Sequence, residues 1–351
     1  MTAAAQKIIE FDLPERLACP QPTEDRNLAR DEVRLLVTDG AGRVEHTQFT
    51  RFDEYLEAGD VLAVNTSATI PAALPVFLPD GAKGVVHFSN RVSETEWLVE
   101  IREIAGDRTI RWKGGEEGMV FGLPDQAAIR LNRRFYKEKR LLVLWIVEFI
   151  ADQTAEAYLK AHARPIQYEK LSRSYPLAYY QTFFSFQPGS SEMPSAGRGF
   201  TRELVDRLLK KGVVFAPVLL HTGVSSLEEN ERPYPEYMEV DPVSAAIVNA
   251  AKAQDRRIIA VGTTAVRALE TATDQAGKVI PFRGDTELYI HEGYQMKTVD
   301  GLLTGFHEPR ASHLHMLQTL AGFEHIDRAY GAAIRKGYFW HQFGDLHLIL
   351  S

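Results

Sequence analysis

The sequence has almost no cysteine, and this scarcity limits the chemistry open to it. Its 351 residues include one cysteine, Cys19, so an internal disulfide and a cysteine-rich metal site are excluded. A chain with so little cysteine is typical of a reducing compartment, and we expect a cytoplasmic protein.

Long apolar runs and an excess of basic charge are also missing. The start, MTAAAQKIIEFDLPERL, has no apolar stretch typical of a signal peptide. The best apolar run, LLVLWIVEFI from Leu141, is short and contains Glu148, so we expect neither a membrane span nor a membrane partner. A net charge of -7 argues against a generally basic nucleic-acid-binding surface, although a local basic patch can coexist with it.

The length and the order of predicted elements indicate two compact units. Strands and helices alternate in residues 1–70 and 151–351, which predicts an α/β domain with a largely parallel sheet and packed helices. Residues 71–150 hold short β-type runs separated by turn residues, which predicts a small, all-β, barrel-like inserted domain. In the second α/β part we expect VVFAPVLL to be a fully buried strand and ELYIHEGYQM to be strand-like.

The loop PSAGRGF, from Pro194, precedes an amphipathic helix. Thr201 is a plausible N-cap for that helix, and Gly212 is expected to end it. Gly197 and Gly199 allow the backbone to approach a ligand closely, and Arg198 between them can reach a carboxylate or phosphate. A helix entry that needs glycine only for its turn explains the same residues.

Two further loops follow predicted strands. VGTTAVRALE, from Val261, sets a glycine and two hydroxyl residues before a helix, and LLHTG places His221 at the end of a strand. Ligands of open α/β sheets gather at the carboxyl ends of strands, and a histidine there can act as an acid or a base. A plain helix cap and a structural histidine are the alternatives, but the loops together can converge on one face.

Histidine is concentrated near the C-terminus, so metal binding has to be considered. His313 and His315 are two residues apart and lie on different faces of the predicted helix, and no H-E-x-x-H pattern is present. We therefore predict no metal. The basic and aromatic run LNRRFYKEKR reads as a charged hairpin tip or, alternatively, as a phosphate contact.

Motifs spread along the chain carry a family resemblance. YYQTFFSFQPGSSEMPSAGRGF, LLHTG, IIAVGTTAVRALE, VDGLLTGFHEP and FGDLHLIL, in this order, resemble the S-adenosylmethionine:tRNA ribosyltransferase-isomerases of queuosine biosynthesis. The resemblance implies an α/β domain interrupted by a β-barrel. It also implies a transferase and isomerase that uses S-adenosylmethionine as a ribosyl donor to a 7-aminomethyl-7-deazaguanine base in tRNA and releases adenine and methionine.

The resemblance, read residue by residue, supplies the candidate site. The acid–base candidates are His221 and His307, which suit the proton transfers that the reaction needs. Ser195 and Arg198 are added to the substrate-binding candidates because they lie in the same loop as Ala196 and Gly197, which match the family. The candidate substrate-binding residues are Gln181, Ser195, Ala196, Gly197, Arg198, Gly223, Gly262, Thr263, Thr264, Arg267, Glu270, Asp300 and Asp345.

The chain also departs from the family pattern. In the segment from Asn65 to Leu74 both arginines of the family are absent, and Arg198 and Gly199 stand where the family has leucine and histidine. Without these arginines and this histidine, the site lacks charge-assisted hydrogen bonds to its ligand, and this loss should alter the choice of substrate. Three hypotheses follow: the family reaction on tRNA, a divergent paralogue with a small-molecule acceptor, and a non-catalytic protein that binds S-adenosylmethionine or tRNA. We expect a monomer or a homodimer.

Overall fold

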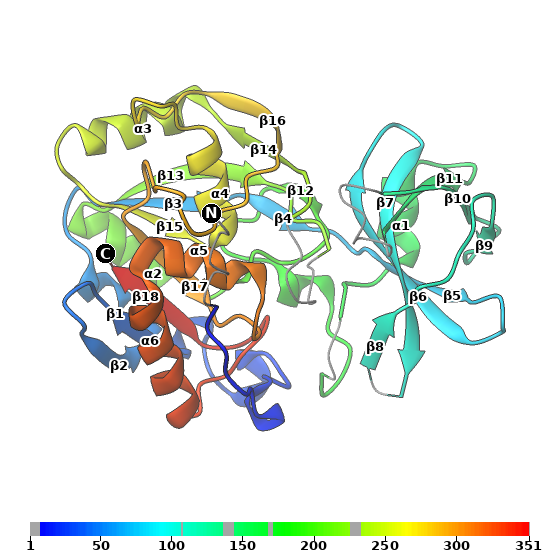
Figure 1. Cartoon of the computed structure of the whole chain (residues 1–351), viewed down its shortest axis with the longest axis horizontal. Coiled ribbons are helices and arrows are strands. Elements are labelled where there is room, and N and C mark those ends of the chain that lie inside the picture. The colour runs from blue at the N-terminus through cyan, green and yellow to red at the C-terminus, as the bar shows by residue number, and fades with distance from the viewer. Residues whose placement is uncertain (1–7, 107, 136–143, 168–170, 225–232, 351) are drawn as a thin grey trace, which may run out of the picture.

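A nine-stranded sheet forms the centre of the larger part of the molecule (Figure 1). The computed structural model describes residues 8–106, 108–135, 144–167, 171–224 and 233–350. The strand order is β16 (Phe282–Thr286), β14 (Glu236–Val240), β13 (Val214–Leu220), β3 (Val61–Asn65), β15 (Ile258–Val261), β17 (Gly301–Gly305), β18 (Leu346–Leu350), β1 (Arg34–Thr38) and β2 (Val44–Gln48). The central strands β13, β3, β15 and β17 run parallel, as do β18 and β1, and the remaining pairings are antiparallel.

Helices cover both faces of this sheet, which confirms the α/β class. In β3, Val61 and Ala63 belong to one buried core, and Leu62 and Val64 belong to the other. The near-continuous apolar strands of the sequence are explained by burial on both faces. The first core takes residues from α3 (Pro242–Lys252), α4 (Thr263–Thr271), α5 (Ser312–Ala321) and α6 (Phe323–Arg335), and the second from α2 (Arg202–Lys211) and a 3-10 helix, Phe49–Tyr55.

A second, seven-stranded antiparallel sheet forms a smaller lobe beside the first (Figure 1). Its strands follow the order β5 (Ala73–Phe77), β6 (Lys83–Arg91), β7 (Glu96–Ala105), β11 (Leu144–Ile150), β10 (Ala128–Arg134) and β9 (Val120–Gly122), and β8 (Arg108–Arg111) pairs with β7. Helix α1 (Ala155–His162) contributes Tyr158 and Leu159 to the core of this lobe. The interrupting β-type section of the sequence therefore corresponds to a sheet with its own core.

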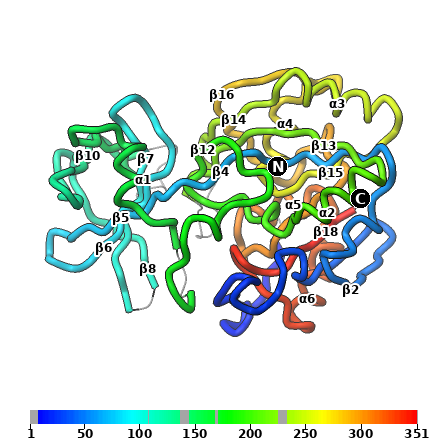
Figure 2. The backbone as a smooth tube through the Cα atoms, turned by 180° about the vertical axis from the view of Figure 1, so that it is seen from behind, coloured from blue at the N-terminus to red at the C-terminus, as the bar shows by residue number. Residues whose placement is uncertain are grey.

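A short two-stranded sheet lies between the lobes. Its strands β4 (Ser67–Thr69) and β12 (Gln187–Ser190) are parallel, and both are seen between the lobes in the two opposite views (Figures 1 and 2). Strand β4 follows β3 after one residue and leads to β5 in the smaller lobe. The connection between the lobes therefore passes through this small sheet.

Local signals for helix α2 are confirmed. The Thr201 side chain accepts a hydrogen bond from the Leu204 N–H, and Gly212 ends the helix with φ of 91°. Such caps satisfy backbone groups that a helix end leaves without partners. Within the described ranges no helix is long and apolar enough to cross a bilayer.

Two strand predictions are wrong in detail. ELYIHEGYQM forms no strand, because β16 ends at Thr286 and the backbone beyond it bonds to side chains. The Thr286 hydroxyl accepts from the Leu288 N–H, and Arg267 donates to the carbonyls of both residues. Strand β13 is not fully buried: β14 pairs with it only at Leu219 and Leu220, which leaves Val214 exposed.

Candidate functional site

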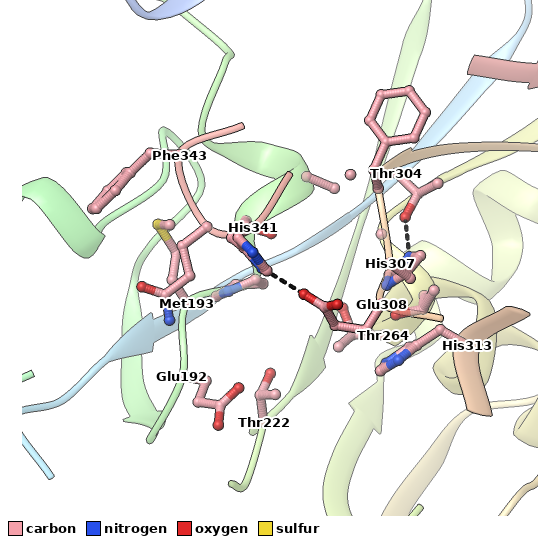
Figure 3. Close-up of a pocket in the computed structure, with 18 of the residues that line it drawn as sticks. Glu192, Met193, Thr222, Thr264, Thr304, His307, Glu308, His313, His341 and Phe343 are labelled. Carbon is pink, nitrogen blue, oxygen red and sulfur yellow. Dashed lines mark hydrogen bonds and ion pairs between the residues drawn. The ribbon is translucent and has the colours of Figure 1, made fainter. Parts of the chain in front are cut away.

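A pocket of about 190 Å³ lies at the carboxyl ends of β15 and β17. Its walls come from segments that are distant in sequence, among them those that carry Glu192, Thr222, Thr264, His307 and His341 (Figure 3). Of the predicted residues, it is lined by Ser195, Ala196, Gly262, Thr263, Thr264 and His307. Two of the loops singled out in the sequence, the one before α2 and the one before α4, therefore do converge.

The first turn of α4 forms one wall of this pocket. Gly262 has φ of 90°, a value that favours glycine, and its N–H donates to the Leu303 carbonyl at 2.8 Å. The N–H groups of Ala265 and Val266 bond back to the Gly262 carbonyl. Thr263 and Thr264 thus stand at the positive end of the helix dipole, where an anionic ligand group is stabilised.

Two stacked imidazoles form another wall. The rings of His307 and His313 have centroids 4.5 Å apart and an interplanar angle of 9°. His307 Nε2 lies 2.8 Å from the Thr304 hydroxyl oxygen, as the dashed line in Figure 3 marks. Burial lowers the pKa of His307 well below its usual range and that of His313 to about 4. Both rings are therefore neutral at pH 7, because burial disfavours the charged imidazolium.

Acidic side chains complete the pocket. His341 Nδ1 lies 3.0 Å from a Glu308 carboxylate oxygen, and Glu192 and Thr222 line the same cavity (Figure 3). The Thr222 hydroxyl oxygen is buried and has no hydrogen-bond partner within the described parts of the chain. It is therefore available to a ligand.

A smaller cavity of about 70 Å³ adjoins the pocket and shares Thr222, Thr263, Thr264 and His313 with it. Arg267 lines this cavity and forms a buried ion pair with Glu236. The other Glu236 oxygen accepts from the Gly223 N–H at 2.7 Å. Arg267 and Gly223 are thus linked through one carboxylate beside the pocket.

His221 lies in a different cavity. A cleft of about 1130 Å³ runs between the lobes, and His221, Gln181 and Tyr237 are among its lining residues. The Gln181 amide is bonded to the backbone N–H and carbonyl of Thr69, at 3.0 and 2.8 Å. The structure therefore separates the two predicted acid–base residues, His221 and His307, although Thr222, next to His221, faces the pocket.

Arg198 and Gly197 line none of these three cavities. Arg198 is 4% exposed, and its guanidinium lies over the Phe343 ring, 4.8 Å from the ring centroid. It donates to Glu24 at 2.6 Å and to the Tyr179 carbonyl at 3.0 Å. Phe343 lines the pocket, so Arg198 contacts a residue of the pocket wall without lining the pocket.

Three predicted carboxylates are bonded to backbone N–H groups away from the cavities. Glu270 accepts from the N–H groups of residues 297–299, and Asp345 accepts from those of Arg34 and Phe339. Asp300 accepts from the Ile258 N–H at 2.8 Å, and burial raises its pKa. These three carboxylates therefore bind backbone groups of the protein, and they do not line the cavities.

Several pocket residues were not predicted. The sequence analysis considered His313 only for metal binding, and it singled out none of His341, Glu192, Thr222 and Glu308. In the described ranges no three His, Cys, Asp or Glu side chains are grouped so that they could hold a metal ion. Part of LNRRFYKEKR, residues 136–140, lies outside the described residues, and Arg133 before it is paired with Glu96.

Comparisons with known proteins agree across the chain. A family model described as "Queuosine biosynthesis protein" matches residues 7–349. The S-adenosylmethionine:tRNA ribosyltransferase-isomerase of Desulforamulus reducens is 34% identical, over 97% of this chain and 98% of that protein. The protein of the same name from Carboxydothermus hydrogenoformans is 35% identical, over 98% of this chain and 100% of that protein.

A solved structure supports the same relationship. The crystal structure of S-adenosylmethionine tRNA ribosyltransferase from Thermotoga maritima matches with a TM-score of 0.54 and 27% sequence identity. The match covers 97% of this chain and 99% of that one. Both lobes are therefore included in the similarity.

Proposed function

The chain belongs to the queuosine biosynthesis protein family, and from this premise we propose that it is an S-adenosylmethionine:tRNA ribosyltransferase-isomerase. It transfers the ribosyl part of S-adenosylmethionine to a 7-aminomethyl-7-deazaguanine base in tRNA, isomerises it, and releases adenine and methionine. The observation that carries this proposal is the pocket in which the start of α4 meets neutral, stacked imidazoles. A paralogue with another acceptor is not favoured at this degree of similarity.

The pocket supplies groups that the reaction needs. The positive end of α4, at Thr263 and Thr264, takes the methionyl carboxylate. His307 is the base that removes the acidic proton next to the sulfonium, because its ring lines the same pocket as the start of α4. Arg267 lines the adjoining cavity, next to the proposed site of S-adenosylmethionine, and its positive charge is paired with Glu236.

The acceptor base enters from the cleft between the lobes. With about 1130 Å³, this cleft is large enough for a nucleobase and its neighbours, and His221, which lines it, is adjacent in the chain to Thr222, which lines the donor pocket. A tRNA acceptor also supports a cytoplasmic location. The oligomeric state, monomer or homodimer, and the domain limits at residues 70 and 150 stay predictions.

The test follows free adenine and the mass of the modified base. Purified protein is incubated with S-adenosylmethionine, with and without tRNA that carries the aminomethyl-deazaguanine base. We expect adenine release that depends on the tRNA and accompanies a heavier base. His307→Gln should abolish release while S-adenosylmethionine still binds, whereas His291→Gln, a control at an exposed position, should not. Binding of S-adenosylmethionine without release on this tRNA would instead indicate another acceptor.

A further inference from the structure

The His221 ring is held in one orientation. His221 follows the end of β13, and its backbone N–H donates to the Tyr237 carbonyl at 2.9 Å. One face stacks on the Tyr237 ring, with centroids 5.8 Å apart and an interplanar angle of 22°. Gly189 lies against the imidazole so closely that a Cβ there would overlap the ring atoms. The ring therefore has little freedom to rotate.

A chain of hydrogen bonds connects the His221 imidazole to two buried serines. His221 Nδ1 lies 2.8 Å from the Ser67 hydroxyl oxygen, which lies 2.6 Å from the Ser190 hydroxyl oxygen. The Ser190 oxygen accepts from the Thr222 N–H at 2.9 Å. Both serine side chains are 0% exposed, so this chain of hydrogen bonds lies inside the protein.

The direction of these bonds follows from counting hydrogens. If Nδ1 donated to Ser67, then Ser67 would donate to Ser190, and the Ser190 hydrogen would be left with no acceptor in the described part of the chain. In the opposite direction Ser190 donates to Ser67 and Ser67 donates to Nδ1, so every hydrogen is used. Leaving a buried donor without a partner costs about 1 to 3 kcal/mol, and this cost selects the second arrangement.

We propose that Ser67 and Ser190 are positioning residues that hold His221 as the tautomer with its proton on Nε2, so that the ring presents one N–H donor to the cleft. The other ring nitrogen is occupied by Ser67 within the wall. Burial lowers the pKa of His221, which agrees with a neutral ring. In this arrangement His221 is a hydrogen-bond donor, and a base at Nδ1 is excluded.

The partner of this donor is an acceptor atom of a heteroaromatic base. The cleft around His221 is lined by the rings of Trp97, Phe135 and Tyr237 and by the amide of Asn90, which suit a flat ring with polar edges. This identification rests on the proposed function. The base has two possible sources, the adenine of S-adenosylmethionine and the deazaguanine of tRNA, and both offer a ring nitrogen or carbonyl oxygen.

The tautomer is tested directly by NMR. In full-length protein with labelled histidine, long-range proton–nitrogen correlations show which ring nitrogen carries hydrogen, and His221→Gln assigns the signal. We expect the proton on Nε2 in the wild type and a mixture of tautomers in Ser67→Ala and in Ser190→Ala. A wild-type proton on Nδ1, or a tautomer unchanged in both serine variants, would overturn the proposal. Ser93→Ala, exposed on the cleft rim, is the control.

Kinetics identify the source of the base. His221→Phe should lower kcat/KM by roughly threefold to tenfold, the value of one neutral hydrogen bond, and His221→Gln should restore part of it through its amide donor. Weaker binding of S-adenosylmethionine alone indicates adenine, and a raised KM for tRNA alone indicates deazaguanine. Unchanged values for both substrates in His221→Phe would contradict the proposal. A wild type without tRNA-dependent adenine release would contradict the proposed function instead, and the NMR result would still stand.

Discussion

At the scale of single residues, two carboxylates that were predicted to bind substrate use their hydrogen-bonding oxygens within the fold. Glu270 accepts from three consecutive backbone N–H groups, and Asp345 is held by Arg34 and by the Phe339 N–H. Carboxylates bonded in this way resist replacement, because a buried donor without a partner is costly. Their roles as substrate ligands stay predictions.

Buried histidines give a pH dependence of stability. Burial lowers the pKa of His347 to about 3, and its side chain is 0% exposed. In the unfolded chain the same group titrates near pH 6.5, so between about pH 3 and 6.5 the unfolded state binds more protons. The free energy of unfolding therefore falls as the pH is lowered through this window. For His347 alone the loss between pH 7 and pH 5 is about 2 kcal/mol.

Urea unfolding at both pH values measures this effect. His347→Asn should reduce the difference in unfolding free energy between pH 7 and pH 5 by about 2 kcal/mol, whatever its cost at pH 7. The control is His291→Asn, at an exposed position. An equal difference in His347→Asn and in the wild type would show that this imidazole is not held neutral by burial.

At the scale of elements, helix α1 belongs to the core of the smaller lobe although it follows the last strand of that lobe in sequence. Tyr158 is 1% exposed, packs on Phe149 at 5.2 Å between ring centroids, and donates to the Pro124 carbonyl at 2.6 Å. The helix thus closes one side of this sheet. A division of the chain at residue 150 would separate the helix from the strands that it covers.

Removing the Tyr158 ring tests this packing. Tyr158→Ala should lower the free energy of unfolding of the smaller lobe by about 3 to 5 kcal/mol, because a large buried ring is replaced by a cavity. Three of the four tryptophans, Trp97, Trp112 and Trp145, lie in this lobe, so tryptophan fluorescence during urea unfolding reports mainly on it. Ala161→Ser, at an exposed position on the same helix, is the control. A change below about 1 kcal/mol would mean that the lobe is stable without this helix.

At the scale of the whole molecule, the lobes touch through a small set of backbone and side-chain contacts. The Ser89 hydroxyl accepts from the Val224 N–H at 3.0 Å, and the Asn90 amide donates to the Pro235 carbonyl at 2.7 Å. Gly223 lies at this contact, and a Cβ there would come within 2.5 Å of the Ser89 hydroxyl oxygen and 2.6 Å of the Asn90 amide oxygen. A side chain at residue 223 would therefore have to displace the Ser89 and Asn90 side chains that join the lobes.

Gly223→Ala should push the lobes apart. The expected results are a larger radius of gyration in small-angle X-ray scattering, a loss of about 1 to 3 kcal/mol in stability from overpacking, and slower adenine release. Gly122→Ala is a matched control, since nothing lies within 4 Å of its added Cβ. Unchanged scattering together with unchanged turnover in Gly223→Ala would argue against a cleft set by this contact.

The caps of helix α2, the α/β class and the family could be predicted from the sequence, whereas the end of one strand and the burial of another could not. The Thr201 cap, the Gly212 stop and the doubly buried strands depend on neighbouring residues and on hydrophobic periodicity, and both can be read along the chain. Only the tertiary structure decided which polar side chains face a cavity. It placed His221 and His307 in different cavities, turned Arg198 toward Glu24, and brought Glu192 and His341 to the pocket. The physical reason is that a polar group takes the partner that folding brings within hydrogen-bond distance, and the partner of Arg198, Glu24, is 174 residues away in sequence.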